Sequence, residues 1–274
     1  MSGSQDGRIR TPWFNLQKSN PRAKTRLFCF PYAGGGPSIY RGWEHYLPAG
    51  VDVWPVQLPG RGSRYNETPY ASWDALVTDL AEAIKDFLDL PFSFFGHSLG
   101  ALLSFELALR LRGRLGVEPL HLFVSGCRAP QLPRDDPHIN HLPDEQFIKE
   151  VGALNGTPRE VLENRELLQT VLGALRADFR LAETYACSAE SPLGCPVTAF
   201  GGSEDAAGTR EEMEAWELRT TGPFNYWILP GDHFFIHTSE PMVLQILSRE
   251  FRAMLTRPED ARSRQASHAY ERGD

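Results

Sequence analysis

Short, nearly continuous hydrophobic runs alternate along the chain with longer stretches of helical periodicity. Such runs are typical of strands that are buried on both faces, as in parallel sheets. Six segments are expected to be strands: 27–30, 51–56, 92–95, 120–124, 197–200 and 226–229. The alternation of strands and helices predicts an α/β fold with a mainly parallel central sheet flanked by helices.

Three helices are expected around these strands, over 72–88, 100–111 and 241–255. Ser72 is suited to the N-cap of the first because its hydroxyl can accept a hydrogen bond from a free backbone amide. Pro241 is suited to the first helical position of the last, where no amide donor is needed.

One long segment interrupts the alternation. About 70 residues between the fourth and fifth expected strands lack a strand signal. Pro143 followed by two acidic residues predicts the start of a helix there. A second, amphipathic helix is predicted from a spacing of four, three and four residues: Leu168, Leu172, Leu175 and Phe179. We interpret residues 130–195 as a helical lid inserted in the α/β core, and a helical subdomain without a role at the site is the alternative.

The polar, mixed-charge ends of the chain are expected to lie outside the core. The chain divides into a mobile N-terminal arm, a core in two pieces and a disordered C-terminal tail: 1–25, 26–129 with 196–256, and 257–274. Within the arm, Trp13 and Phe14 are candidates for a short edge strand.

Composition excludes several classes of protein. The 274 residues are 41% hydrophobic and 23% charged, which suits a globular protein with a sizeable core. The formal charge of −7 disfavours nucleic-acid binding, and no hydrophobic run approaches the roughly 18 residues of a membrane span. No secretion signal is visible, and Cys29, Cys127, Cys187 and Cys195 form no metal-binding pattern. We therefore expect a cytoplasmic protein without a structural zinc site.

The strongest chemical signal is Gly96-His97-Ser98-Leu99-Gly100, a G-x-S-x-G pattern. It follows an expected strand and precedes an expected helix, the context in which this pattern holds a nucleophilic serine on a tight turn. The small flanking residues allow strand and helix to approach closely. Ser98 is therefore the candidate nucleophile; a glycine-rich turn with an idle serine is the alternative.

A nucleophilic serine needs a histidine base and a carboxylate that orients it, in this architecture in the order Ser, acid, His. His233 directly follows the last expected strand and is the best candidate base, with His237 in reserve. For the acid, Glu204 and Asp205 both follow the strand 197–200, and the alternation of side chains does not separate them. Asp232 is expected to face away from the neighbouring imidazole.

The oxyanion of the tetrahedral intermediate needs two backbone N–H donors. Leu99, directly after the nucleophile, is one candidate. The glycine-rich segment PYAGGG after the first strand brings backbone close to the substrate, and Ala33 is the candidate donor there. A turn that only reverses the chain is the alternative, while dinucleotide binding is disfavoured because G-x-G-x-x-G spacing is lacking.

Five segments in order resemble the free-standing type II thioesterases, α/β-hydrolases that act beside polyketide synthases and nonribosomal peptide synthetases. They are LFCFPYAGGGPSIYRGWEHYLP, VQLPGRGSRYNETPY, FGHSLGALLSFELALRLR, FGGSED and LPGDHFFI. The similarity spans about 26–255 and is weakest in the insertion. By position it assigns the nucleophile to Ser98, the acid to Asp205 and the base to His233. It also assigns the oxyanion donors to Ala33 and Leu99 and implies that the insertion is a lid.

The resemblance implies hydrolysis of aberrant or stalled acyl thioesters on the phosphopantetheine arm of acyl or peptidyl carrier proteins, without cofactor or metal. A monomer is the default expectation. Carrier proteins are usually acidic, yet residues 131–190 hold 11 acidic and 6 basic residues, a net charge of −5. Electrostatic steering is therefore expected to be poor. Arg61 and Arg64 are candidate carrier contacts or, equally, solvated loop arginines.

Two other functions remain open from the sequence. A general carboxylesterase or acyltransferase of the same fold uses the same triad, so only relative rates on thioesters and oxygen esters separate it from a thioesterase. A catalytically idle module that docks on a synthase is the alternative from a different class, and the complete set of Ser, Asp and His disfavours it.

Overall fold

Six strands form one sheet in the computed structural model, in the order β2-β1-β3-β4-β5-β6. The structure describes residues 11–14, 20–134, 137–153, 165–187, 191–206 and 208–256. The strands are β1 (Thr25–Phe30), β2 (Val51–Pro55), β3 (Phe92–His97), β4 (Leu122–Ser125), β5 (Val197–Gly202) and β6 (Phe224–Leu229). Every neighbouring pair is parallel, as the hydrophobic pattern predicted.

All six predicted strands are present, with ends that differ by a few residues. Every residue of β1, β3 and β5 is buried, because helices cover both faces of these strands. β6 lies at the edge of the sheet and is only partly buried. Parallel strands end at a common edge, so the loops after β1, β3, β5 and β6 meet there.

The helices alternate with the strands. They are α1 (Trp73–Ile84), α2 (Leu99–Leu115), α3 (Asp144–Ala153), α5 (Arg165–Glu183), α6 (Arg210–Glu214), α7 (Phe235–Thr238) and α8 (Glu240–Thr256). Short 3₁₀ helices are η1 (Pro37–Tyr40), η2 (Trp43–His45), η3 (Gly62–Arg64), η4 (Lys85–Phe87) and η5 (Ala215–Arg219). Within the described residues, no helix is long and apolar enough to cross a membrane.

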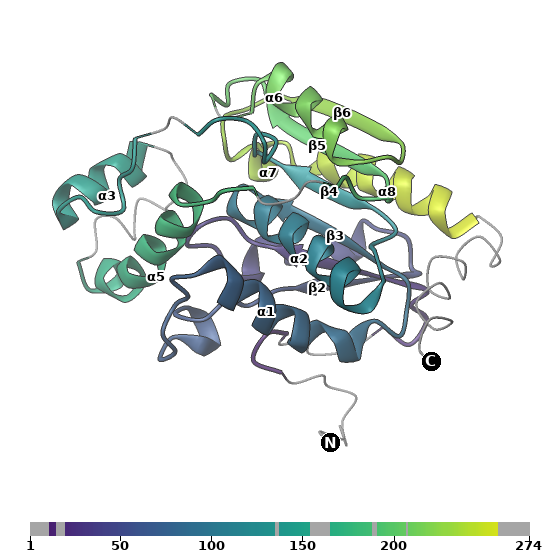
Figure 1. The fold of residues 1–274 in the computed structure, drawn as a ribbon, viewed down its shortest axis with the longest axis horizontal. Coiled ribbons are helices and arrows are strands. Elements are labelled where there is room, and N and C mark those ends of the chain that lie inside the picture. Colours follow the sequence, from purple (N-terminus) through teal and green to yellow (C-terminus); the bar gives the residue numbers. More distant parts are fainter. Residues whose placement is uncertain are drawn as a thin grey trace.

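The sheet separates two hydrophobic cores, with α1 and α2 on one face and α8 on the other (Figure 1). Alternate residues of β1 divide between them: Phe28 and Phe30 pack toward α1 and α2, whereas Leu27 and Cys29 pack toward α8. The two-residue period of a strand explains this division. The sheet is therefore the central layer of three.

Two details at the helix starts differ from prediction. Ser72 occupies the N-cap of α1, but its side chain makes no capping hydrogen bond, and its carbonyl oxygen instead accepts the N–H of Leu76 at 3.1 Å. Pro241 is the second residue of α8, which begins at Glu240.

The insertion between β4 and β5 contains α3 and α5, and no strand lies among its described residues. Figure 1 shows α3 farther from the sheet than α5. The helices contact each other through a small hydrophobic cluster of Phe147, Val151 and Leu175. The side chain of Leu168, which the spacing placed on the same face, lies outside the described residues.

The expected mobile arm over 1–25 is wrong for part of that segment. Phe14 is fully buried against Phe28 and Trp54, and the Gln57 N–H donates to the Trp13 carbonyl oxygen at 2.8 Å. Trp13 and Phe14 thus dock on the core, although they form no strand. Residues 1–10, 15–19 and the expected tail 257–274 lie outside the described residues.

Candidate active site

Ser98 lies on a sharp turn between β3 and α2. Its φ of 55° and ψ of −117° are strained for a non-glycine residue, and no other described non-glycine residue has a positive φ. Such a conformation costs about 1–3 kcal/mol and persists only where the surroundings impose it. A Cβ on Gly96 would collide with the backbone of Gly100, so these flanking glycines permit the turn. The Ser98 N–H donates to the Ser125 carbonyl oxygen at 2.8 Å.

His233 and Asp205 form a pair at the same edge of the sheet. His233 Nδ1 lies 2.9 Å from Asp205 Oδ2. The Asp205 side chain is 3% exposed and that of His233 is 21% exposed. Because a carboxylate only accepts, the pairing places the proton of neutral His233 on Nδ1 and leaves Nε2 as a base.

The loops after β5 and β6 hold this pair in place. The Ser203 N–H donates to the Leu229 carbonyl oxygen at 2.7 Å, and the Glu204 N–H donates to that of Gly231 at 2.9 Å. These bonds extend the pairing of the adjacent parallel strands β5 and β6 beyond the sheet. The approach of Asp205 to His233 therefore follows from the strand order.

The structure separates the two carboxylates that the alternation of side chains left open, Glu204 and Asp205. Asp205 is buried against His233, whereas Glu204 is exposed. Asp232 accepts the Phe234 N–H at 2.8 Å, a local turn contact. The reserve base His237 has its Nε2 3.0 Å from the Tyr32 hydroxyl.

His97 is a site residue that sequence reasoning missed. Its buried ring lies between Ser125 Oγ, 2.9 Å from Nδ1, and the His233 carbonyl oxygen, 2.9 Å from Nε2. Because a carbonyl only accepts, Nε2 carries the proton and Nδ1 accepts that of Ser125. Burial, assisted by the nearby His233, lowers the pKa of His97 well below 6.5, so the ring is neutral. The residue before the nucleophile thus holds the backbone of the candidate base.

The two candidate oxyanion donors differ in their setting. Leu99 is the first residue of α2, where free backbone amides and the helix dipole favour negative charge. Ala33 lies in the turn closed by the Gly35 N–H and the Tyr32 carbonyl oxygen at 2.9 Å. Within the described residues, neither the Ala33 nor the Leu99 amide donates a hydrogen bond. Both amides remain available to a ligand.

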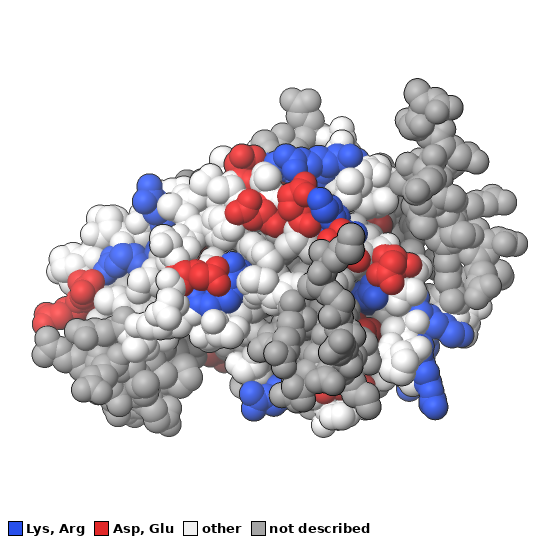
Figure 2. Space-filling view, turned by 90° about the horizontal axis from the view of Figure 1, so that it is seen from below, with Lys and Arg blue, Asp and Glu red and all other residues white. Residues whose placement is uncertain are grey.

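Arg61 and Arg64 are neither solvated nor presented to a partner, so both interpretations made from the sequence were wrong. Their exposed fractions are 8% and 7%. Arg61 pairs with Asp178 of α5, while Arg64 pairs with Glu67 at 2.6 Å and stacks on Trp13, its Cζ 4.3 Å from the ring centre. Among the described residues on the face in Figure 2, basic and acidic side chains intermix.

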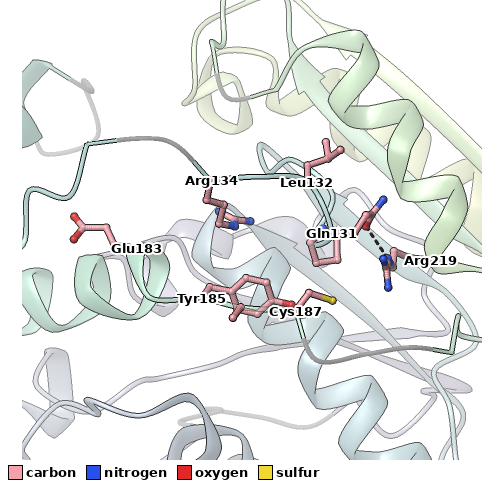
Figure 3. A pocket seen from close by; sticks show the side chains of 9 residues that line it. Gln131, Leu132, Arg134, Glu183, Tyr185, Cys187 and Arg219 are labelled. Atoms are coloured by element: carbon pink, nitrogen blue, oxygen red, sulfur yellow. Dashed lines mark hydrogen bonds between the residues drawn. The ribbon is translucent and has the colours of Figure 1, made fainter.

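A cavity of about 440 Å³ lies where the insertion meets the core (Figure 3). It is lined by Pro130, Gln131, Leu132, Arg134, Glu183, Tyr185, Ala186, Cys187 and Arg219. One wall is fixed by a hydrogen bond from Arg219 Nε to Gln131 Oε1 at 2.6 Å. The lining does not include Ser98, Asp205 or His233, and its polar groups suit a ligand with hydrogen-bonding atoms.

Among the described residues, no group of three or more His, Cys, Asp or Glu side chains is placed to hold a metal ion.

Comparison with known proteins identifies the family. The family model for the thioesterase domain matches residues 25–251, and the chain belongs to this family. It is 44% identical over 245 residues to gramicidin S biosynthesis protein GrsT of Aneurinibacillus migulanus, a match that covers 89% of this chain and 95% of that protein. The chain is therefore a thioesterase, as its motifs predicted.

Solved structures agree with this assignment. RedJ, a thioesterase from the prodiginine biosynthetic pathway in Streptomyces coelicolor, is 42% identical with a TM-score of 0.77, over 83% of this chain and 86% of its own. YbtT, a type II thioesterase from the yersiniabactin NRPS/PKS biosynthetic pathway, is 31% identical with a TM-score of 0.73, over 85% of this chain and 95% of its own. The predicted α/β-hydrolase fold is confirmed.

Proposed function

We propose that this thioesterase uses Ser98, Asp205 and His233 as a catalytic triad that releases acyl groups from the phosphopantetheine arm of carrier proteins. In this role it removes aberrant or stalled groups from a polyketide or nonribosomal peptide synthase. The observation that carries the triad is the buried Asp205–His233 pair at the sheet edge where Ser98 occupies its strained turn. The names of the similar proteins GrsT and YbtT support the biosynthetic setting.

The first half of the reaction forms an acyl-enzyme. Ser98 Oγ attacks the thioester carbonyl carbon while His233 Nε2 takes the hydroxyl proton, and Asp205 stabilises the imidazolium. The amides of Ala33 and Leu99 donate to the oxyanion. Collapse of the tetrahedral intermediate breaks the carbon–sulfur bond, and the proton on His233 passes to the departing pantetheine sulfur.

The second half releases the acid. A water molecule gives one proton to His233 and attacks the acyl carbon, and a second tetrahedral intermediate collapses to the free acid and Ser98, whose oxygen regains the proton. His97 supports both halves because its Nε2–H holds the His233 carbonyl oxygen at 2.9 Å. Its neutral state avoids a second positive charge beside the imidazolium.

We further propose that the insertion, residues 130–195, is a lid over the acyl site, and that the enzyme acts as a cytoplasmic monomer. The contact of α5 with the glycine-rich segment supports the lid. The four unpaired cysteines suit a reducing compartment. Few large hydrophobic side chains are exposed on the described surface, which favours a monomer. Light scattering coupled to size-exclusion chromatography tests the oligomeric state.

The test of function compares short acyl-pantetheine thioesters with their oxygen-ester analogues, using the wild type and Ser98→Ala. We expect faster turnover of thioesters and a loss of at least about 10³-fold in the variant. Acylated carrier protein is then compared with acyl-pantetheine. Preference for oxygen esters would identify a general esterase, and failure of Ser98 to react with a fluorophosphonate or turn over carrier-bound substrate would identify an idle docking module.

A further inference from the structure

The inserted helix α5 contacts the glycine-rich segment that carries Ala33. Gly34 has a φ of 76°, and a Cβ on it would lie 2.6 Å from Leu175 Cδ1 of α5, so helix and segment touch directly. The Gly34 N–H donates to Asp178 Oδ2 at 2.8 Å. The helix therefore binds the residue next to the candidate oxyanion donor by one apolar and one polar contact.

Asp178 is held in place by Arg61, and each of the two side chains makes a hydrogen bond to the backbone of the glycine-rich segment. The side chains are 3% and 8% exposed. Arg61 Nη2 donates to Asp178 Oδ1 at 2.8 Å, and Nη1 donates to Oδ2. Arg61 Nη1 also donates to the Gly35 carbonyl oxygen at 3.3 Å. Asp178 thus binds the amide of one glycine while Arg61 binds the carbonyl of the next.

We propose that Asp178 is a positioning residue for the oxyanion hole. By occupying the Gly34 amide and, through Arg61, the Gly35 carbonyl, it fixes the peptide planes that follow Ala33 and aims the Ala33 N–H at the substrate oxygen. The oxyanion hole is then complete only when α5 is docked on the core. This inference rests on the proposed function, because it assigns Ala33 as a donor.

Other contacts dock α5 independently of this pair, which makes the inference testable. Trp73 Nε1 of α1 donates to the Leu181 carbonyl oxygen of α5 at 2.7 Å, and the hydroxyl of Tyr185, two residues after the end of α5, donates to Glu106 Oε1 of α2 at 2.6 Å. A buried ion pair replaced by apolar side chains of similar size often leaves stability unchanged or higher. The double variant Arg61→Met with Asp178→Leu is therefore expected to leave α5 docked while it removes the hydrogen bonds of this pair to Gly34 and Gly35.

The experiment measures kcat and KM for a short acyl-pantetheine, with the melting temperature of each variant. Loss of one oxyanion donor lowers kcat by about 10²–10³-fold, so a misaimed donor is expected to lower it by about 10–100-fold with little change in KM. A trifluoromethyl ketone that forms a tetrahedral adduct with Ser98 is expected to lose affinity by a similar factor. Thermal stability of the double variant is expected to stay near that of the wild type.

A conservative variant separates positioning from stability. Asp178→Asn keeps a carbonyl oxygen for the Gly34 N–H but leaves Arg61 without its countercharge. We expect it to be less stable than the double variant yet to retain more kcat. The opposite order, with activity following stability, would assign Asp178 a structural role only.

The matched control is Glu67→Gln. It removes the charge of Glu67 from the Arg64–Glu67 pair in the same chain segment, just as Asp178→Asn removes that of Asp178, and neither partner is hydrogen-bonded to α5 or to the glycine-rich segment. Its kcat is expected to equal that of the wild type. A wild-type kcat in the double variant would overturn the inference about Asp178. The proposed function would still stand in that case, provided that Ser98→Ala is inert. Activity in Ser98→Ala would instead overturn the proposed function itself.

Discussion

The carboxyl edge of the sheet and the inserted helix α5 each bury one carboxylate against a basic side chain, by different means. At the sheet edge, Asp205 and His233 follow adjacent parallel strands, and backbone hydrogen bonds between their loops fix their approach. In the insertion, Asp178 reaches Arg61 across 117 residues of chain through side-chain packing of a helix. The first pair is tied to the sheet, while the second is tied to the position of α5.

This difference divides the candidate site into two halves. The candidate acid and base are fixed by strand pairing and cannot separate unless the loops after β5 and β6 part. The oxyanion side depends on α5, which is held by a few side chains such as Trp73 and Tyr185. Displacement of α5 would therefore affect the oxyanion half first and leave the acid–base half assembled. The variants below test the two halves separately.

The largest effect on kcat is expected for a substitution at the sheet edge. Asp205→Asn replaces an acceptor by an amide that favours the wrong imidazole tautomer, and kcat should fall by about 10³–10⁴-fold. Because the shape of the side chain is kept, the melting temperature should change little. Steady-state kinetics with an acyl-pantetheine thioester, together with thermal unfolding, measures both.

The neighbouring carboxylate supplies the control for this variant. Glu204 is exposed one residue before Asp205, so Glu204→Gln should keep wild-type kcat. Equal losses in the two variants would mean that the acid is not specified by burial against His233, and the assignment of Asp205 would be abandoned.

The acid–base half, at the edge of the sheet, could be predicted because the sequence signals for it are local. Continuous hydrophobic runs marked the strands, and parallel strands bring the loops after β3, β5 and β6 to one edge. The residue pattern did not separate Glu204 from Asp205, since adjacent residues of a loop can face either way, and only the resemblance to type II thioesterases favoured Asp205. The burial of Asp205 depends on loop hydrogen bonds that no short pattern encodes.

The support that α5 gives to the oxyanion half could not be predicted from the sequence, for a physical reason. The periodicity of α5 predicted a helix but not what it packs against, so Arg61 and Arg64 in the loop after β2 were expected to be at the surface. Nothing local to Arg61 shows that Asp178 will cover it. A buried arginine needs a partner, and an unpaired aspartate on the apolar side of a predicted helix is a signal that a search for such partners can use.

A smaller effect on activity is expected at His97. His97→Asn removes the donor to the His233 carbonyl oxygen, whereas His97→Gln places an amide nitrogen near the position of Nε2 and keeps that donor. We expect kcat to fall by about 10–100-fold in the Asn variant, with KM nearly constant, and to recover in large part in the Gln variant. Equal activities of the two variants would show that the hydrogen bond does not position the base.

The same histidine predicts a pH dependence of stability. Burial lowers the pKa of His97 well below 6.5 in the folded chain, while the unfolded chain binds a proton near 6.5. Below that pH the unfolded state holds more protons, so the free energy of unfolding falls by up to about 1.4 kcal/mol per pH unit. In His97→Gln this contribution is lost. The free energy of unfolding, measured with denaturant at several pH values between 5 and 7, should therefore change less steeply with pH than in the wild type. An unchanged slope would mean that other groups dominate.

The smallest effect on the stability of the whole chain is expected for a substitution in α3, where the insertion is farthest from the sheet. Phe147 of α3 is fully buried, but among the described residues its cluster holds three buried side chains and is separate from the two main cores. Phe147→Ala should therefore open α3 locally, with amides of 144–153 exchanging at least about 10-fold faster while strand amides keep their protection. Phe123→Ala, an equally buried site on β4, should instead lower the protection of the whole sheet, because its core is shared by β1, β3 and α8. If both variants changed exchange everywhere, the insertion would be one cooperative unit with the core, and α5 would have no separate position from which to control the oxyanion half.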